Sequence, residues 1–509
     1  MDGRTRLIWN VITSWTSQLL IIFIGFFMPR VIDTELGQVS VGIWDFAWSL
    51  VHYVSIAHVG IGSALNRYIS IYRAANELEK LKTAVSTVVV IQSVLASIVA
   101  IAVVFLAYQL PNFFQDDLAG QETTAQLTVL LLGLSIAVHL LFDTSRGVLT
   151  GCHRWDLHNG LVAGFNVASS IAMISAVLLG HGLAVMAAIY LLSTTLESLV
   201  RMFIARQVCG DAKYQLTKFS PKFLSEIFKF GFKSFTLAIS PVIITQTCSI
   251  ALASSLGPVA LSIFARPGAL VRHIQTFVTR FSFMLTPMAA PILKSDGLSA
   301  LNEFTTNCAR YCFAFTLPVV ILFCLFGDDL VLVWMGQNYV NHNVILILGL
   351  GFLLPLAQSP LVRVLIGVNL HGVAARISLG TTLLALTIGI AIIKNTTESI
   401  EAYALLMAGT MTLIDGILIP LYACKKLKLS LSSYLTSAFS RVMIISLVPV
   451  IPIILVNKFV PTSLLVILLQ VSFYSATVIT LYWVSLLDDA AKAKILELIP
   501  TKGLFKRAP

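Results

Sequence analysis

Charged residues are scarce in this chain of 509 residues. Asp, Glu, Lys and Arg together make up 11% of it, and hydrophobic residues make up 57%, against about 25% and roughly 45–50% in soluble domains. The mean hydropathy of +0.89 agrees. Because no soluble core can bury so much apolar surface, the composition excludes a soluble enzyme, a soluble nucleic-acid-binding protein and a disordered chain. Long unbroken apolar runs, rather than short alternating ones, predict a polytopic helical membrane protein.

Sequence motifs for catalysis are missing as well. The chain contains no GxxxxGK[ST] phosphate loop, no dinucleotide-binding loop and no HExxH pair. We therefore predict that it is not an enzyme and has no catalytic residue, no metal and no cofactor. Any uphill transport must then draw on an ion gradient, the membrane potential or the substrate gradient. The seven cysteines include no CxxC pair and predict no disulfide framework, and Cys308 with Cys312 is interpreted as a packed pair.

Fourteen apolar segments are present, each near the roughly 20 residues that cross a bilayer. They are 9–29, 39–63, 83–108, 124–149, 159–180, 183–205, 231–255, 258–286, 306–327, 343–366, 374–394, 402–423, 441–457 and 463–486. We expect two pseudo-symmetric six-helix lobes around a central cavity, plus two more helices. The expected parts are an N-terminal lobe (1–205), a basic linker (206–230), a C-terminal lobe (231–424), two additional spans (441–487) and a cytoplasmic tail (488–509).

The basic residues predict how the chain is oriented. With the N-terminus in the cytoplasm, 28 of the 34 Lys and Arg fall in cytoplasmic segments and helix ends, three fall outside, and three lie within the eighth span. This asymmetry follows the positive-inside rule, so both termini are predicted to be cytoplasmic. In the basic linker, Ser220-Pro221 predicts a helix start. The residues that follow predict either a short helix in the inner interface or an ordinary positive-inside linker.

An internal repeat with an offset of 220 residues relates two turns. The sequence LGQV at 36–39 matches LGPV at 256–259, and both join the end of one span to the start of the next. The same offset pairs His52 with Arg272. Two similarly oriented halves around a binding site at mid-membrane are an arrangement found in transporters.

The eighth span carries the most informative ionisable residues. Arg266, His273 and Arg280 are spaced by seven residues and share one helix face over about 21 Å, with Arg272 beside them. We expect this stripe to face a wet cavity that attracts an anionic group such as a pyrophosphate. In the alternative, Arg280 extends to the inner surface and Arg266 pairs with a buried acid.

Acidic residues inside the spans are candidates for ion coupling. Asp45, Ser49 and His52 share one face of the second span. Asp45 either binds a coupling proton or sodium ion or pairs with an arginine of the eighth span. Asp415 is the second coupling candidate, and a packed, hydrogen-bonded acid is its alternative interpretation.

Two further acid–base pairs lie near cytoplasmic helix ends. Asp143 with Arg146, and Glu197 with Arg201, have the spacing of neighbours on a helix surface. We interpret both as structural ion pairs.

Short motifs in both halves resemble a known family. They are Pro29-Arg30, Leu36-Gly37, Gly42, Gly60 and Asn66-Arg67-Tyr68 in the first half, and Lys229-Phe230-Gly231-Phe232, Pro241 and Ser255-Leu256-Gly257-Pro258 in the second. The chain is similar in these motifs to the Wzx-type O-antigen and polysaccharide flippases of the multidrug/oligosaccharidyl-lipid/polysaccharide (MOP) exporter superfamily. Many relatives have twelve spans, and fourteen is closer to the lipid II flippases, whose arginine-rich first-helix motif this chain lacks.

The resemblance implies a V-shaped, two-lobed bundle in the bacterial cytoplasmic membrane. It implies alternating-access translocation of a polyprenyl-pyrophosphate-linked oligosaccharide, with membrane lipids around it, a polysaccharide polymerase and a chain-length regulator as candidate partners, and no nucleic acid. The expected cavity cations are Arg30, His52, Arg266, Arg272, His273 and Arg280. The alternative functions are an ion-coupled multidrug antiporter of the same superfamily and a lipid II-type flippase.

Overall fold

The computed structural model confirms an all-helical chain. It describes residues 3–54, 61–114, 118, 120–212, 218–459, 463–487, 489 and 492–493, and these contain helices and turns but no strand. Gly60 of the family-like motif and most of the expected tail at 488–509 lie outside the described residues. The α-helices are α1 (Gly3–Leu36), α2 (Gln38–Val54), α3 (Ile61–Ala74), α4 (Leu78–Gln109), α5 (Pro111–Phe114), α6 (Glu122–Gly151), α7 (Trp155–Leu178), α8 (Leu183–Val208), α9 (Pro221–Phe283), α10 (Thr286–Ser295), α11 (Gly297–Met335), α12 (His342–Ala357), α13 (Ser359–Gly367), α14 (His371–Asn395), α15 (Ile400–Met411), α16 (Ile419–Lys426), α17 (Leu431–Leu435), α18 (Arg441–Leu447), α19 (Val450–Phe459) and α20 (Leu464–Ser485). Short 3₁₀ helices occur at Gly210–Ala212 and Gln337–Tyr339, and π-helical segments at Thr412–Leu418 and Thr436–Ser440.

The described helices can accommodate the fourteen membrane spans expected from the sequence. Among the described residues, 11 helical segments are long and apolar enough to cross a membrane. One of them, Phe235–Ser295, has 61 residues and a non-helical residue at Gly257, so it holds two spans. The helices α1, with 34 residues, and α2, with 17, supply two more. Counted in this way, the described helices provide room for fourteen spans. Each apolar run is helical because a span must satisfy its own backbone hydrogen bonds in lipid.

The two turns of the internal repeat share their backbone geometry. Gly37 ends α1 with φ +83°, and Gly257 interrupts α9 with φ +79°, both in the left-handed region that glycine tolerates. The helices that follow these turns also touch, because a Cβ at Gly42 would lie 2.0 Å from the carbonyl oxygen of Pro258. Backbone can approach this closely only where one partner has no side chain. The geometry supports the 220-residue repeat at these turns.

The described chain falls into two compact units. The first contains Met1–His273, Asp328–Leu348 and His371–Ile414, and the second contains Ile274–Gly327, Gly349–Leu370 and Asp415–Pro509. The lobes expected from sequence, 1–205 and 231–424, divide the chain differently and stay a prediction.

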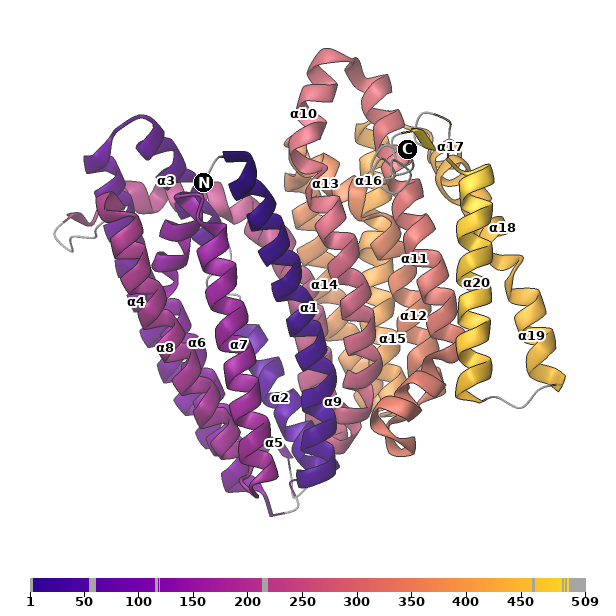
Figure 1. Cartoon of the computed structure of the whole chain (residues 1–509), viewed down its shortest axis with the longest axis horizontal. Coiled ribbons are helices and arrows are strands. Elements are labelled where there is room, and N and C mark those ends of the chain that lie inside the picture. Colours follow the sequence, from indigo (N-terminus) through magenta and orange to yellow (C-terminus); the bar gives the residue numbers. More distant parts are fainter. Residues whose placement is uncertain are drawn as a thin grey trace, which may run out of the picture. The chain divides into compact units, whose positions relative to one another are not determined.

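The first unit is built around the indigo-to-magenta helices of Figure 1. There α6 packs against α4 and α8, and α1 packs against α7. A buried apolar cluster joins helices α3, α4, α6 and α8, which are far apart in the sequence. It includes Leu65, Ile69, Leu81, Val85 and Leu149. These packed helices hold the polar side chains described below.

In the second unit, α10 packs against α13, and α18 packs against α20. A small buried cluster joins Phe326, Ile453, Tyr474 and Val478. The Tyr474 hydroxyl donates to the carbonyl oxygen of Ser446 at 3.1 Å, so the last helix is held by a buried hydrogen bond as well as by apolar contact.

The helix start predicted at Ser220-Pro221 is confirmed, but the helix that begins there is not a short separate one. The Phe223 amide donates to the Ser220 hydroxyl at 3.3 Å, and α9 then continues without a break as far as Gly257. Phe223 is buried, with its ring 4.9 Å from that of Tyr68. Phe223 thus belongs to the apolar cluster of the first unit, and Lys222 beside it is exposed.

One disulfide was not predicted from the sequence, which gave no disulfide framework. Cys152 and Cys209, 57 positions apart in the sequence, are joined, with their Cα atoms 6.7 Å apart. Both lie in the apolar cluster at the adjacent ends of α6 and α8. Helix packing brings them together, and sequence spacing gave no sign of it. Cys308 and Cys312 are both buried and free, and no group of three or more His, Cys, Asp or Glu suited to a metal occurs in the described part of the chain.

Candidate cationic site

A buried ion pair joins α2 to the second half of α9. The Arg266 guanidinium contacts the Asp45 carboxylate, and its Nε donates to the carbonyl oxygen of Ser262 at 3.3 Å. Arg266 is 3% exposed, and the Asp45 side chain is 18% exposed. Of the two predicted roles of Asp45, the structure therefore shows the salt bridge with an arginine of the eighth span. Arg266 correspondingly neutralises an acid instead of facing open solvent.

Aromatic rings surround this ion pair. The Arg266 guanidinium carbon lies 5.8 Å from the centre of the Trp334 ring, within range of a cation–π contact. The indole N–H of Trp334 donates to the carbonyl oxygen of Phe26 at 2.7 Å. The Phe26 ring in turn stacks on His273, with centres 5.8 Å apart and planes inclined by 17°. The Phe26 and Trp334 contacts were not predicted, because nothing in the sequence links residues so far apart.

Arg272 and His52 are the solvent-accessible members of the group. Both side chains are exposed, and the Arg272 charge acts on both Asp45 and His52. The Nδ1 of His52 is 2.6 Å from the carbonyl oxygen of Trp48, which orients the ring. A Cβ at Gly268 would lie 3.3 Å from Nη1 of Arg272, so the glycine leaves space for the guanidinium.

These residues define what we call the cationic site: Asp45, His52, Arg266, Arg272 and His273. They all belong to the first unit. The site has two arginines and one carboxylate, so it carries net positive charge even with both histidines neutral. A buried pair beside an accessible guanidinium suits the binding of a phosphate-type anion, because guanidinium forms paired hydrogen bonds with phosphate oxygens.

Arg30 is anchored to the segment that follows Trp334. Its Nη1 donates to the carbonyl oxygen of Met335 at 2.7 Å and lies 3.7 Å from the Asp33 carboxylate. The Tyr339 hydroxyl donates to the same carboxylate. Although 46% of the Arg30 side chain is exposed, these contacts fix it at the end of α1.

Arg280 and Asp415 belong to the second unit and are described apart from the cationic site. Both are half-buried. Asp415 lies in the π-helical segment Thr412–Leu418, and no described residue forms a hydrogen bond or ion pair with its carboxylate. The next carbonyl oxygen, that of Gly416, accepts from Gln358 at 2.7 Å. π-Helical turns inside α-helices are frequent at functional sites.

The two ion pairs predicted near helix ends are confirmed, but they line a cavity that the sequence did not reveal. Asp143 pairs with Arg146 at 2.8 Å, and Glu197 pairs with Arg201 at 3.2 Å. A cavity of about 270 Å³ between α6, α7 and α8 is lined by Arg146, Glu197 and Arg201, and also by His139, His158, Val162, Phe165, Asn166, Ser169, Tyr190, Ser193 and Thr194.

We call this space the buried polar cavity. Arg201 is 0% exposed and its Nη1 faces Glu197, yet its Nε has no hydrogen-bond partner among the described residues, and neither has Nδ1 of His158. Buried donors of this kind are normally satisfied by water, so the cavity has both the room and the partners to hold ordered water.

Comparison with known proteins places this geometry on a known transporter fold. Residues 14–158 match the MatE family model. A Shigella flexneri protein named "Putative O-antigen transporter" is 23% identical over 326 residues, which is 62% of this chain and 74% of that protein. A lipid II flippase, MurJ, in an inward closed conformation matches with a TM-score of 0.68 and 15% identity, covering 93% of this chain and 97% of its own.

An inward-facing multidrug resistance MATE family transporter of the MOP superfamily matches with a TM-score of 0.66 and 16% identity, covering 83% of this chain and 98% of its own. Residues 14–158 are thus similar to the MatE family model, and the chain has the fold of these transporter structures. The fold agrees with the superfamily that the sequence motifs resemble, and the many membrane-spanning helices identify a multi-pass membrane protein.

Proposed function

We propose that this protein is a flippase that moves a polyprenyl-pyrophosphate-linked oligosaccharide across the bacterial cytoplasmic membrane by alternating access, with both termini in the cytoplasm. The observation that carries the proposal is the accessible Arg272 guanidinium beside the buried Asp45–Arg266 pair. An anionic head in a membrane needs fixed cations in an accessible space, because bare charge in hydrocarbon is costly.

Each member of the cationic site has a separate task in this proposal. Arg272 binds the pyrophosphate through paired hydrogen bonds, and His52, held by the Trp48 carbonyl oxygen, lines the same space. Arg266 and Asp45 hold α2 against α9, so the binding groups keep their positions. His273 is stacked on Phe26 and supports the same face. The prenyl chain stays in the lipid and needs no polar contact.

The remaining candidate residues serve the transport cycle. Arg30 and Arg280 contribute positive charge on the path of the head group. Asp415 is the better of the two coupling candidates, since Asp45 is already engaged by Arg266 whereas no described residue pairs with Asp415. An intramembrane acid of this kind can take up a proton or sodium ion in one state and release it in the other.

The comparisons support a lipid-linked saccharide as the class of substrate, and they do not identify the substrate of this chain. One relative is named for O-antigen transport and another for flipping lipid II, both of them lipid-linked saccharides. A polysaccharide polymerase and a chain-length regulator remain candidate partners. Neighbouring genes for glycosyltransferases and a polymerase would favour the oligosaccharide over lipid II.

An ion-coupled multidrug antiporter is the second candidate, and the likeness to a multidrug transporter favours it. Cationic drugs, however, call for acids that are available to them. In the cationic site the one carboxylate faces two arginines, which disfavours a cationic ligand. Gradient-driven efflux of cationic dyes from vesicles would select this function instead.

The test is complementation of surface polysaccharide in a deletion strain, normalised to the amount of protein in the membrane. Arg272→Ala should reduce export at least tenfold, since a charge-assisted hydrogen bond contributes about 1.5–3 kcal/mol. Arg272→Lys should recover part of it, because lysine keeps the charge and loses the fork. Arg376→Gln is the matched control: this exposed arginine of α14 is outside the cationic site and should complement fully. Full complementation by Arg272→Ala would overturn the proposed role of the cationic site.

A further inference from the structure

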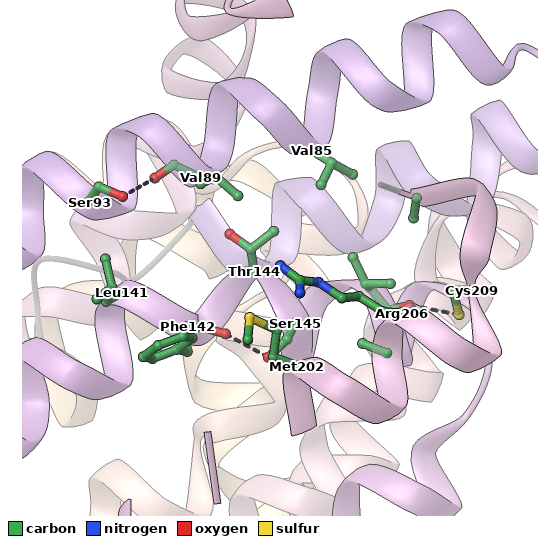
Figure 2. A pocket seen from close by; sticks show the side chains of 13 residues that line it. Val85, Val89, Ser93, Leu141, Phe142, Thr144, Ser145, Met202, Arg206 and Cys209 are labelled. Atoms are coloured by element: carbon green, nitrogen blue, oxygen red, sulfur yellow. Dashed lines mark hydrogen bonds between the residues drawn. The ribbon is translucent and has the colours of Figure 1, made fainter. Parts of the chain in front are cut away.

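A second, mainly apolar groove lies in the first unit, between α4, α6 and α8. Its volume is about 340 Å³. Val85 and Val89 line it from α4, Phe142 and Val148 from α6, and Met202 from α8. Figure 2 shows Val85, Val89, Phe142 and Met202 around the groove. The groove shares no lining residue with the cationic site or with the buried polar cavity, and the proposed transport function does not use it.

The helices that form the groove also present apolar side chains to the outside. Val94, Ile98 and Ile101 of α4 and Leu196 and Phe203 of α8 are exposed to between 46% and 71%. In a multi-pass membrane protein such surfaces face the acyl chains of the bilayer. An apolar groove among them is therefore in reach of lipid and is not expected to hold water.

One cation lines this groove, and it lies at the end of α8. Arg206 is in the last turn of that helix, and Figure 2 shows its side chain reaching into the groove toward Thr144. Hydroxyls of Ser93, Thr144 and Ser145 are in the same lining. The predicted orientation puts this end of α8 at the cytoplasmic surface, where the phosphates of the inner leaflet lie.

We propose that the groove binds one acyl chain of an anionic phospholipid, with the lipid phosphate on Arg206. Its apolar walls match an acyl chain, and the guanidinium complements the phosphate charge at the depth where a head group lies. The bound lipid would fill the space between α4, α6 and α8 and so stabilise the first unit.

The experiment uses the full-length protein, purified and delipidated in a neutral detergent. Dioleoyl-phosphatidylglycerol is added, and its binding is followed by native mass spectrometry and by the shift in melting temperature. We expect Arg206→Gln to weaken binding roughly tenfold, as loss of a charge-assisted hydrogen bond predicts, and Arg206→Lys to weaken it less. Arg376→Gln removes an exposed arginine outside the groove and should bind like the wild type.

The wild-type protein supplies a second test that depends on no variant folding. Dihexanoyl-phosphatidylglycerol has the same head group with short chains, so it should bind much more weakly if the groove holds an acyl chain. Val89→Phe narrows the groove and should reduce this dependence on chain length. Equal binding of phosphatidylglycerol to wild type and Arg206→Gln, or equal binding of long and short chains, would overturn the proposal. Binding of undecaprenyl phosphate in preference to phosphatidylglycerol would also overturn it, by making the groove a prenyl-chain site.

Discussion

At the scale of single residues, Arg266 and Asp45 depend on one another. Each is largely withdrawn from water, so removing one leaves the other charge buried and uncompensated. Breaking such a pair typically costs about 3–5 kcal/mol, whereas replacing both charges with apolar side chains of similar volume is often neutral. The ion pair is thus a question of stability before it is a question of substrate binding.

The first prediction separates these two roles. Asp45→Leu and Arg266→Met should each lower the melting temperature and the amount of protein in the membrane, while the double variant should regain most of both. Export by the double variant should also recover if the pair only holds α2 against α9. The measurements are thermal unfolding in detergent, membrane abundance and polysaccharide complementation. A double variant no more stable than the single ones would contradict a purely structural pair.

The residues of the cationic site could be identified from the sequence, but not all of their contacts could. A seven-residue spacing was enough to place Arg266 and His273 on one helix face. The partner of Arg266 was left open between an acid and a cavity, because pairing across 221 positions depends on tertiary packing. Trp334 was missed entirely, since a lone tryptophan in an apolar run carries no sign of the cation that it faces.

At the scale of elements, the irregular segments are where sequence reasoning was weakest. Propensity and capping predicted the start of α9 at Pro221, but not that the helix would run on through the basic linker into the next span. The π-helical segment around Asp415 was not predicted either, because nothing in the sequence marks a change from α- to π-helical hydrogen bonding. Local rules find helix ends, whereas packing decides how a helix continues.

The second prediction concerns that π-helical segment. Asp415→Asn is nearly isosteric and breaks no hydrogen bond or ion pair with any described residue, so the protein should accumulate and melt like the wild type. If Asp415 carries the coupling ion, transport in proteoliposomes should lose its response to an imposed proton or sodium gradient. Transport down the substrate gradient should remain.

Asp45→Asn is the contrasting variant, since it breaks the contact with Arg266 and should lower stability. Undiminished gradient stimulation in Asp415→Asn would exclude that residue as the coupling group.

At the scale of the whole molecule, composition and hydropathy were sufficient to predict a helical membrane protein. Fourteen apolar runs fold as helices because a span must satisfy its own backbone hydrogen bonds in lipid, so run length alone indicates the number of spans. The buried polar cavity and the apolar groove between α4, α6 and α8 could not be predicted from run length. Both arise from gaps between α4, α6, α7 and α8, and gap sizes depend on how the side chains of separate helices fit together.

The last prediction tests the orientation of the whole chain. In a variant with all seven cysteines replaced, single cysteines are introduced at exposed positions that the charge distribution assigns to opposite sides: Ala75 and Lys428 inside, His181 and Thr397 outside. A membrane-impermeant maleimide applied to intact spheroplasts should label His181→Cys and Thr397→Cys only, and inverted vesicles should show the reverse pattern. The positive-inside bias of 28 against three is large enough that one orientation should account for nearly all labelling. The opposite pattern would place Arg206 and the groove at the outer surface, and the lipid that fits the groove would then have to come from the outer leaflet.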